Sequence, residues 1–262
     1  MEITLLGREQ SDRQAPASRY ELTCGLYGLR RAESGQDVLA ACRLRFLVFN
    51  LELREGFESA YRDGYDTDQF DRVCDHLLVE HRLTRQVVGT YRMQTGRRAA
   101  SEIGYYSARE FDFRQYEGLR GQLVELGRAA IHRDHRSFEV LTLLWRGIAT
   151  YARANGARYL IGCSSLTSQC PQEGADMFWR LREFQTEPAL RTEPLPQFDC
   201  AVREPSERAA SMKPPKLLRA YLSAGARICG RPAIDREFKT IDFLTLMDLE
   251  QAGGRPRLRF LR

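Results

Sequence analysis

Residues 124–137 read VELGRAAIHRDHRS, and this stretch decides the fold. Its apolar residues predict a buried strand over 123–131, yet Glu125 and Arg128 both lie within that strand. Two charges in a buried strand are unfavourable unless they are paired or used. A basic turn from His132 to Arg136 follows, and then an apolar helix. A strand, a basic turn and a helix together present backbone N–H groups and a positive helix end to an anionic or carbonyl ligand, so we expect the functional centre here.

The pattern on either side of this stretch predicts further strands and helices. Downstream, Ser137 caps a helix over 138–154, a buried strand follows at 158–163, and a second helix covers 172–182. Upstream, two apolar runs separated by a polar turn predict a hairpin. The other expected elements are strands at 19–26, 198–202 and 240–249, helices at 34–53 and 216–224, hairpin strands at 76–80 and 87–94, and a short helix opened by a capping box at 107–110.

This order predicts one α/β fold. A mixed, twisted sheet would combine an antiparallel meander with a parallel β-α-β unit, and helices would flank it. We expect a flexible N-terminal tail at 1–18, one domain at 19–250 and a basic C-terminal tail at 251–262. The loop at 55–73 is long for a plain connection, and long loops in compact domains are often functional.

Composition limits the class of protein. The chain has 262 residues, of which 43% are hydrophobic and 29% charged, as is ordinary for a soluble globular protein. No apolar run approaches the roughly 20 residues of a membrane span, and the N-terminus lacks a signal-peptide pattern. Seven cysteines without C-x-x-C spacing indicate reduced thiols in the cytoplasm. The formal charge of +5 favours acidic partners. A nucleic-acid binder is disfavoured, because the arginines are spread along the chain without a known module.

Several candidate residues have a structural and a functional interpretation. Glu125 and Arg128 can form an internal salt bridge, or Glu125 can be a pocket carboxylate whose burial brings it nearer to a usable base. Asp68 and Asp71 fit solvated turn residues as well as a site for an ammonium group. His76 is more typical of a structural hydrogen bonder than of a base.

Two further motifs are typical of a metal site and of a nucleophilic serine, and we favour neither interpretation. The histidines of the 132–136 turn lie three residues apart with an acid between them, but a third group of metal ligands is absent from the sequence, so we expect no metal. Ser164 and Ser165 follow a buried strand, but the segment lacks the second glycine of a nucleophile elbow. Contacts to the backbone and to a donor arm are the preferred role for these serines.

Nine short blocks of the sequence carry a family resemblance. They are Arg45–Phe49, Asp68–Asp71, Asp75–Val79, Val88–Arg92, Tyr106–Phe111, Glu125–Arg128, Leu144–Gly147, Tyr221–Ala226 and Asp242–Leu246. In order and spacing the chain resembles the acyl-carrier-protein-dependent N-acyltransferases of the GNAT-like superfamily that make lyso-ornithine lipid. These are related to long-chain N-acyl amino acid synthases and, distantly, to acyl-homoserine lactone synthases. The resemblance covers about residues 20–250.

The resemblance implies an enzyme that moves a 3-hydroxy fatty acyl group from acyl carrier protein to the α-amine of an amino acid, with ornithine favoured. It implies catalytic roles for Glu125 as base, Arg128 as a positioning group and the Ile131 N–H as oxyanion donor. The matching substrate-binding positions are Arg45, Phe49, Asp68, Asp71, His76, Arg92, Arg136, Trp145, Ser164 and Ser165. No metal or organic cofactor is implied beyond the acyl-phosphopantetheine of the carrier.

The turn at Arg136–Val140 departs from the wider superfamily, because it lacks the glycines that wrap the pyrophosphate of coenzyme A. That departure favours a carrier protein as donor. The C-terminal tail alternates arginines with apolar residues, which favours a peripheral contact with the inner face of an anionic membrane. The alternatives that stay open are an N-acyl amino acid or homoserine lactone signal synthase and a non-catalytic, membrane-associated acyl-binding protein.

Overall fold

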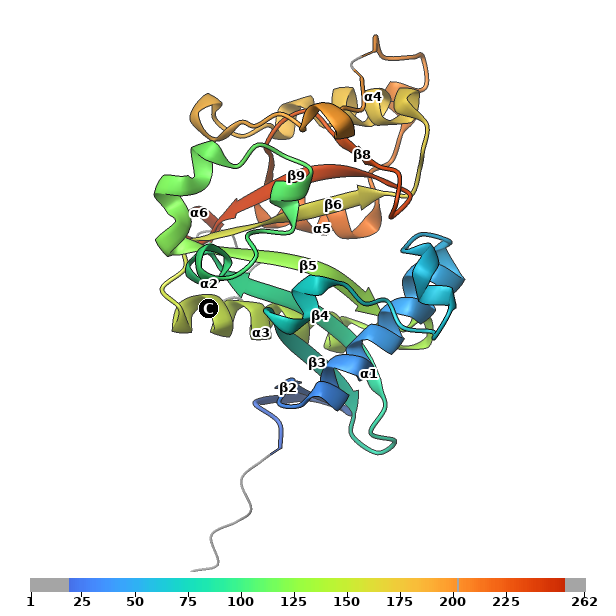
Figure 1. Cartoon of the computed structure of the whole chain (residues 1–262), viewed down its shortest axis with the longest axis vertical. Coiled ribbons are helices and arrows are strands. Elements are labelled where there is room, and N and C mark those ends of the chain that lie inside the picture. Colours follow the sequence, from blue (N-terminus) through green and yellow to red (C-terminus); the bar gives the residue numbers. More distant parts are fainter. Residues whose placement is uncertain (1–18, 202, 253–262) are drawn as a thin grey trace, which may run out of the picture.

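The computed structural model describes residues 19–201 and 203–252. Its central feature is a nine-stranded sheet in the order β1-β2-β3-β4-β5-β6-β9-β7, with β8 paired to β9 (Figure 1). The strands are β1 (Leu22–Cys24), β2 (Tyr27–Arg31), β3 (Asp75–His81), β4 (Val87–Thr95), β5 (Leu123–Ile131), β6 (Tyr159–Leu166), β7 (Arg227–Ile228), β8 (Ala233–Asp235) and β9 (Thr240–Asp248). The helices are α1 (Gly35–Arg45), α2 (Gly96–Ser101), α3 (Phe138–Ala154), α4 (Pro171–Arg180), α5 (Lys216–Ala224) and α6 (Leu249–Ala252).

The sheet combines an antiparallel half with one parallel pair. Strands β1 to β5 form an antiparallel meander, β5 and β6 are parallel and joined through α3, and β6 pairs antiparallel with β9. A connection through a helix is what a parallel pair requires. The predicted fold class, a mixed sheet with an antiparallel meander and a β-α-β unit, is confirmed.

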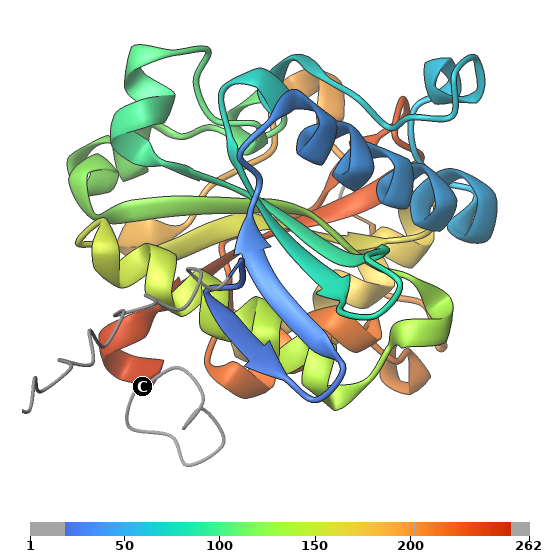
Figure 2. The same cartoon turned by 90° about the horizontal axis from the view of Figure 1, so that it is seen from below.

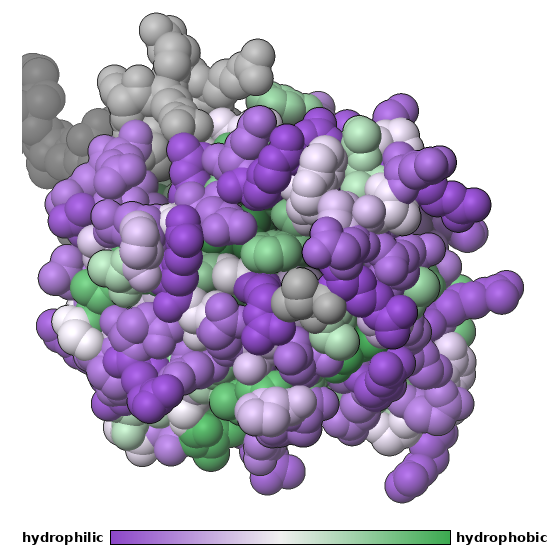
Figure 3. All heavy atoms as spheres, turned by 90° about the horizontal axis from the view of Figure 1, so that it is seen from above, coloured by the Kyte–Doolittle hydropathy of each residue, from purple (hydrophilic) through white to green (hydrophobic). Residues whose placement is uncertain are grey.

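Helices cover both faces of the sheet (Figure 2). Helix α3 packs its apolar stripe on the face formed by β1 to β4, and α1 lies on the opposite face against β3, β4 and β5. Ser137 caps α3 by accepting a hydrogen bond from the N–H of Val140, as the sequence predicts. The face in Figure 3 is mostly hydrophilic, with apolar residues in small separate patches. Among the described residues, no helix is long and apolar enough to cross a membrane.

Several sequence expectations need correction. The predicted strand at 19–26 is shortened to β1, because Gly25 takes a positive φ of 54° and turns the chain into β2, the second strand of a hairpin that the sequence pattern missed. The capping box expected at 107–110 is absent: Ser107 lies inside a 3₁₀ turn and its N–H donates to Glu125 instead. A capping box forms at Asp68 and Asp71.

Differences also occur near the C-terminus and in the first long helix. The strand expected at 198–202 is reduced to a single bridge between Asp199 and Ala233, whereas β7 and β8 were not predicted. The helix expected at 34–53 changes to π geometry over Phe46–Leu53. Helix α6 includes residues 251 and 252, so the start of the predicted tail is helical. The predictions for residues 1–18 and 253–262 lie outside the described residues.

Candidate active site

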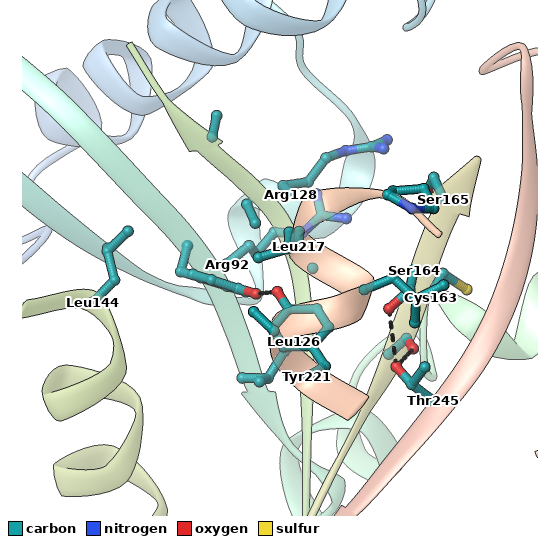
Figure 4. A pocket seen from close by; sticks show the side chains of 18 of the residues that line it. Arg92, Leu126, Arg128, Leu144, Cys163, Ser164, Ser165, Leu217, Tyr221 and Thr245 are labelled. Carbon is teal, nitrogen blue, oxygen red and sulfur yellow. Dashed lines mark hydrogen bonds between the residues drawn. The ribbon is translucent and has the colours of Figure 1, made fainter. Parts of the chain in front are cut away.

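Strands β5 and β6 diverge after a short parallel pairing, and the opening between them contains a cavity. They pair only from Leu123 to Glu125 on β5 and from Tyr159 to Ile161 on β6. The cavity beyond has a volume of about 620 Å³. Figure 4 shows the two strands parting and α5 lying across the gap, with Leu217 and Tyr221 on α5 beside it.

Two local features of the sequence create this opening. Gly162 lies where the strands part, and a Cβ there would be 2.1 Å from the carbonyl oxygen of Leu126, so only glycine fits. On the other side of β5, the pairing with β4 shifts by one residue, so that Arg128 and Ala129 lie opposite Tyr91. Arg128 takes a positive φ of 51° at this bulge. Backbone strain of this kind is often found at functional sites.

The end of β5 directs a backbone N–H into the cavity. The N–H of His132 donates to the carbonyl of Val88 at 2.8 Å, and Ile131 is paired with Gly89. Because hydrogen-bonded and non-hydrogen-bonded pairs alternate along an antiparallel ladder, the N–H of Ile131 points away from β4 and toward the gap. Ile131 also lines the cavity. An N–H in this place can donate to the oxygen of a bound thioester.

Glu125 lies on the cavity wall and accepts three hydrogen bonds. The donors are the backbone N–H of Tyr106 at 2.9 Å, the backbone N–H of Ser107 at 2.7 Å and the side-chain amide of Gln94 at 2.7 Å. The side chain is almost fully buried, at 5% exposed. Three donors stabilise a carboxylate and fix its orientation. Glu125 therefore also holds the turn that begins at Tyr106.

The arginine network, which we define as Arg45, Arg92 and Arg128 with Asp66, Asp68 and Asp71, extends from the cavity wall into the protein. Arg45 is fully buried and lies 2.9 Å from Asp66 and 2.7 Å from Asp71. Arg92 bridges Asp68 at 2.6 Å and Asp71 at 3.0 Å. Three arginines thus face three aspartates, and the arginines hold the pKa of Asp71 well below its usual range despite burial, which acts to raise it. The network is balanced in charge.

Arg128 lines the cavity, as does Arg92, and it is held by aromatic rings as well as by an aspartate. Its Nη2 donates to Asp68 at 3.0 Å, and its guanidinium carbon lies 5.0 Å, 4.8 Å and 4.2 Å from the ring centres of Phe57, Tyr106 and Phe238. Cation–π contacts of this kind hold a guanidinium in place after it has lost its water. Its position supports orienting a substrate group, since arginine stays charged at any physiological pH.

The predicted site residues fall into two sets. Those that line the cavity are Glu125, Arg128, Ile131, Phe49, Arg92, Arg136, Trp145, Ser164 and Ser165. Those that do not line it are Arg45, Asp68, Asp71 and His76, which lie one layer behind. His76 contacts the carbonyl of Asp71 at 3.3 Å, and burial and the charge of Arg45 lower its pKa to about 4, so it is neutral at pH 7. Its contacts are structural ones.

The serines of β6 have hydrogen-bonding surroundings. The hydroxyl of Ser164 is buried and lies 3.1 Å from that of Thr245, which donates to the carbonyl of Gly162 at 2.8 Å (Figure 4). Among the described residues that line the cavity, none is a histidine that could activate a serine. The arrangement suits a substrate contact better than a nucleophile.

We define the acid group as Glu55, Glu110 and Asp242, which the sequence pattern did not single out as a set. Glu55 and Asp242 line the cavity, and Glu110 lies beside Asp242 and Cys163. All are at most 5% exposed. Burial and the charge of Asp242 raise the pKa of Glu55 to about 7, and burial raises the pKa of Asp242 and, far more, that of Glu110. They come from a loop, a turn and β9, so no local spacing signals them. Glu110 and Asp242, with Cys163, also bring possible metal-ligand atoms within 4.8 Å of one another.

The fold and the cavity define an acyltransferase of the GNAT class. Residues 44–146 match the family described as "Acetyltransferase (GNAT) domain". The chain is 31% identical over 250 residues to the L-ornithine N(alpha)-acyltransferase of Brucella abortus (strain 2308), covering 88% of this chain and 87% of the relative. It is 30% identical over 254 residues to the enzyme of the same name from Rhodobacter capsulatus, covering 90% and 95%. The chain belongs to this L-ornithine N(alpha)-acyltransferase family.

A solved structure supports the fold. FeeM, an N-acyl amino acid synthase from uncultured soil microbes, superposes with a TM-score of 0.50 at 11% identity, covering 86% of this chain and 92% of that one. At this identity the likeness concerns the fold only. It agrees with the predicted GNAT-like architecture.

Proposed function

We propose that this acyltransferase moves a 3-hydroxy fatty acyl group from the thioester of acyl carrier protein to the α-amine of ornithine, giving a lyso-aminolipid. The observation that carries the proposal is the cavity between β5 and β6, which joins apolar walls to a charged wall in one space. An acyl chain needs the apolar walls, and a zwitterionic amino acid needs the charged wall. The names of the relatives point to ornithine as the acceptor.

The apolar walls suit the acyl chain. Leu144 and Trp145 of α3, Tyr91 of β4 and Met247 of β9 line the cavity and belong to one apolar cluster. Phe49 from the π-helical segment also lines the cavity and packs against Phe238, with ring centres 5.5 Å apart. Trp145 packs edge-on against Tyr221 of α5, with ring centres 5.4 Å apart. The thioester carbonyl would then lie near the end of β5, where the Ile131 N–H stabilises the oxygen as it gains negative charge.

The reaction needs a proton to leave the amine. The nitrogen of the neutral amine attacks the carbonyl carbon, the C–S bond breaks, and the departing thiolate of the phosphopantetheine takes up a proton. Glu125 is the candidate acceptor of the amine proton, directly or through water. Its three hydrogen-bond donors fix its orientation and already engage both of its oxygens, which favours the route through water. Arg128 faces the same space and suits the α-carboxylate of the acceptor.

The turn before α3 supports a carrier-protein donor. Ser137 already caps the Val140 N–H, and Arg136 is engaged by Glu52 at 2.7 Å and by the carbonyl of Ile131 at 3.2 Å. This turn therefore lacks the open, glycine-rich N–H groups that would hold the pyrophosphate of coenzyme A. A phosphopantetheine arm has no pyrophosphate and does not need them.

Transfer to ornithine from the two donors tests this proposal. We expect acylation from 3-hydroxyacyl carrier protein to be much faster than from the matching acyl-coenzyme A. The rate from the carrier should fall as salt rises, because charges at the rim of an interface mainly steer encounter. Equal rates from both donors, without salt dependence, would overturn the carrier-protein part of the proposal.

A lipid product must reach a bilayer, and we propose a peripheral contact with an anionic membrane. The sequence of residues 255–262 alternates arginine with leucine and phenylalanine, and each arginine near an anionic surface contributes about 1 kcal/mol. The protein should co-sediment with anionic vesicles more than with neutral ones. Removal of residues 254–262 should weaken that binding and leave transfer to a soluble acceptor intact. Unchanged vesicle binding would move the membrane contact to another surface.

A further inference from the structure

We propose that the acid group, Glu55, Glu110 and Asp242, binds the side-chain ammonium of the acceptor and so selects a dibasic amino acid. This inference rests on the proposed function, because it assigns the second amine of that acceptor to a place in the cavity. Glu55 and Asp242 both line the cavity, and Glu110 lies behind Asp242 and Cys163. The ligand would be a primary ammonium at the end of a short alkyl chain.

Asp242 is the member whose hydrogen bonding is least complete. Its side chain is 4% exposed, and its Oδ2 accepts from the hydroxyl of Thr240 at 3.2 Å. Its Oδ1 accepts no hydrogen bond of ordinary geometry from the described residues, although the hydroxyl of Ser165 lies near enough to act on the carboxyl group. A carboxyl oxygen of Glu110 lies within 4.8 Å of one of Asp242. A buried carboxylate oxygen without a well-placed donor is unfavourable, and an ammonium supplies the missing donor together with a positive charge.

Glu55 reaches the cavity from a different element. It follows Arg54, which ends the π-helical segment in the left-handed conformation, and its N–H donates to the carbonyl of Phe49 at 2.8 Å. Its carboxylate accepts from the hydroxyl of Thr167, and the charge of Asp242 acts on it. Glu55 and Asp242 are therefore two neighbouring acids that line one cavity and come from opposite ends of the chain.

The acid group lacks the cations that balance the arginine network. Among the described residues, no lysine or arginine forms an ion pair with Glu55, Glu110 or Asp242. The charge of Arg128 acts to lower the pKa of Glu110, but Arg128 already forms an ion pair with Asp68. Asp68 and Asp71, which the sequence suggested for an ammonium, are held by arginines and lie behind the cavity. The acid group, which forms no ion pair, therefore suits an additional positive charge better than Asp68 and Asp71 do.

An ammonium fits this place better than a metal ion. Burial raises the pKa of the Cys163 thiol well above its usual range, so the sulfur stays protonated and is a poor metal ligand. Burial and the neighbouring acids raise the pKa values of Glu110 and Asp242, which disfavours the full negative charge that a divalent cation requires. An ammonium group carries one positive charge and three N–H donors. It therefore suits the carboxyl groups of Glu110 and Asp242 together with Glu55, which titrates near neutral pH.

The test compares ornithine with norvaline, which has the same carbon chain and no side-chain amine. We expect the intact protein to have a higher kcat/KM for ornithine. Asp242→Asn and Glu55→Gln should each lower the ratio of kcat/KM for ornithine to kcat/KM for norvaline by about 10- to 100-fold, the effect of losing one charged hydrogen bond. Glu117→Gln, on an exposed turn away from the cavity, is the matched control.

The outcomes separate the two claims. If the intact protein acylates neither amino acid from any donor, the proposed function fails. If it acylates ornithine and both variants keep the original ornithine-to-norvaline ratio, this inference alone is overturned. Thermal unfolding of each variant shows whether a lost activity reflects a lost fold. Asp242 lies within strand β9, so Asp242→Asn can prevent folding. Two variants outside β9 then keep the test decisive: Glu55→Gln, and Thr167→Val, which removes the hydroxyl that donates to Glu55.

Discussion

The carbonyl oxygen of Leu126 lies against the Cα of Gly162, so closely that a Cβ at residue 162 would be 2.1 Å away. This contact marks the point where β5 and β6 stop pairing and the cavity begins. Both atoms belong to the backbone, so a larger residue cannot be accommodated by a change of rotamer. The width of the cavity therefore depends on a glycine at one position of β6.

The first prediction concerns this glycine. Gly162→Ala should lower the free energy of unfolding by about 1–3 kcal/mol, as overpacked positions do, and reduce transfer because the strands are pushed apart. Urea unfolding measures the stability. The control is Gly118→Ala, where a Cβ meets no atom within 4 Å. An equal effect of both substitutions would show that the contact with Leu126 does not matter.

The second prediction concerns Glu125. The N–H groups of Tyr106 and Ser107 donate to different oxygens of Glu125, so Glu125→Gln places an amide N–H₂ against one of these two N–H groups, which then lacks an acceptor. Turnover should fall by about 10²–10⁴, and the free energy of unfolding by about 1–3 kcal/mol. Rates across pH 6–9 and a denaturation curve check the two effects. A folded variant with near-normal turnover over this range would make Glu125 structural and put the base elsewhere.

The third prediction concerns stability as a function of pH. Burial raises the pKa of Glu55 from 4.5 to about 7, so the folded protein binds this proton more tightly than the unfolded chain does. Its contribution to stability is therefore present below pH 4.5 and is lost as the pH rises to about 7. Glu55→Gln should be as stable as the wild type at pH 4 and more stable by about 3 kcal/mol at pH 8. A stability difference that does not change with pH would contradict the buried, unpaired state of Glu55.

The fourth prediction concerns the arginine network. Arg45→Met should lower the free energy of unfolding by about 3–5 kcal/mol, because it leaves Asp66 and Asp71 buried without this partner. Adding Asp66→Asn should recover part of the loss, because it removes one of the two stranded charges. Chemical denaturation of the single and double variants measures the coupling. Additive losses would show that Arg45 and Asp66 act independently.

Sequence reasoning recovered the parts of the fold that local patterns specify. The β5-α3-β6 unit and the hairpin of β3 and β4 follow from apolar periodicity and from the Ser137 cap. The short strands β2, β7 and β8 were missed, because two to five residues give little periodicity and their pairing depends on distant strands.

The candidate site was predicted in part, for the same reason. Glu125, Arg128 and Ile131 lie within one strand, and all three line the cavity. The acid group was not identified as a set, because its members lie at 55, 110 and 242 and only the tertiary fold brings them together. No local sequence pattern indicated the left-handed backbone conformation of Arg128, since this conformation normally favours glycine. Asp68 and Asp71 could not be assigned to the arginine network before their partners were placed.

The most direct test of the central claim is to identify the nitrogen that becomes acylated. The purified full chain is incubated with 3-hydroxyacyl carrier protein and ornithine labelled with ¹⁵N at the α position, and the product is fragmented in a mass spectrometer. We predict a single acyl-ornithine whose amide contains the labelled α-nitrogen and whose side-chain amine is free. An amide at the side-chain nitrogen, or no acyl-ornithine at all, would contradict the account.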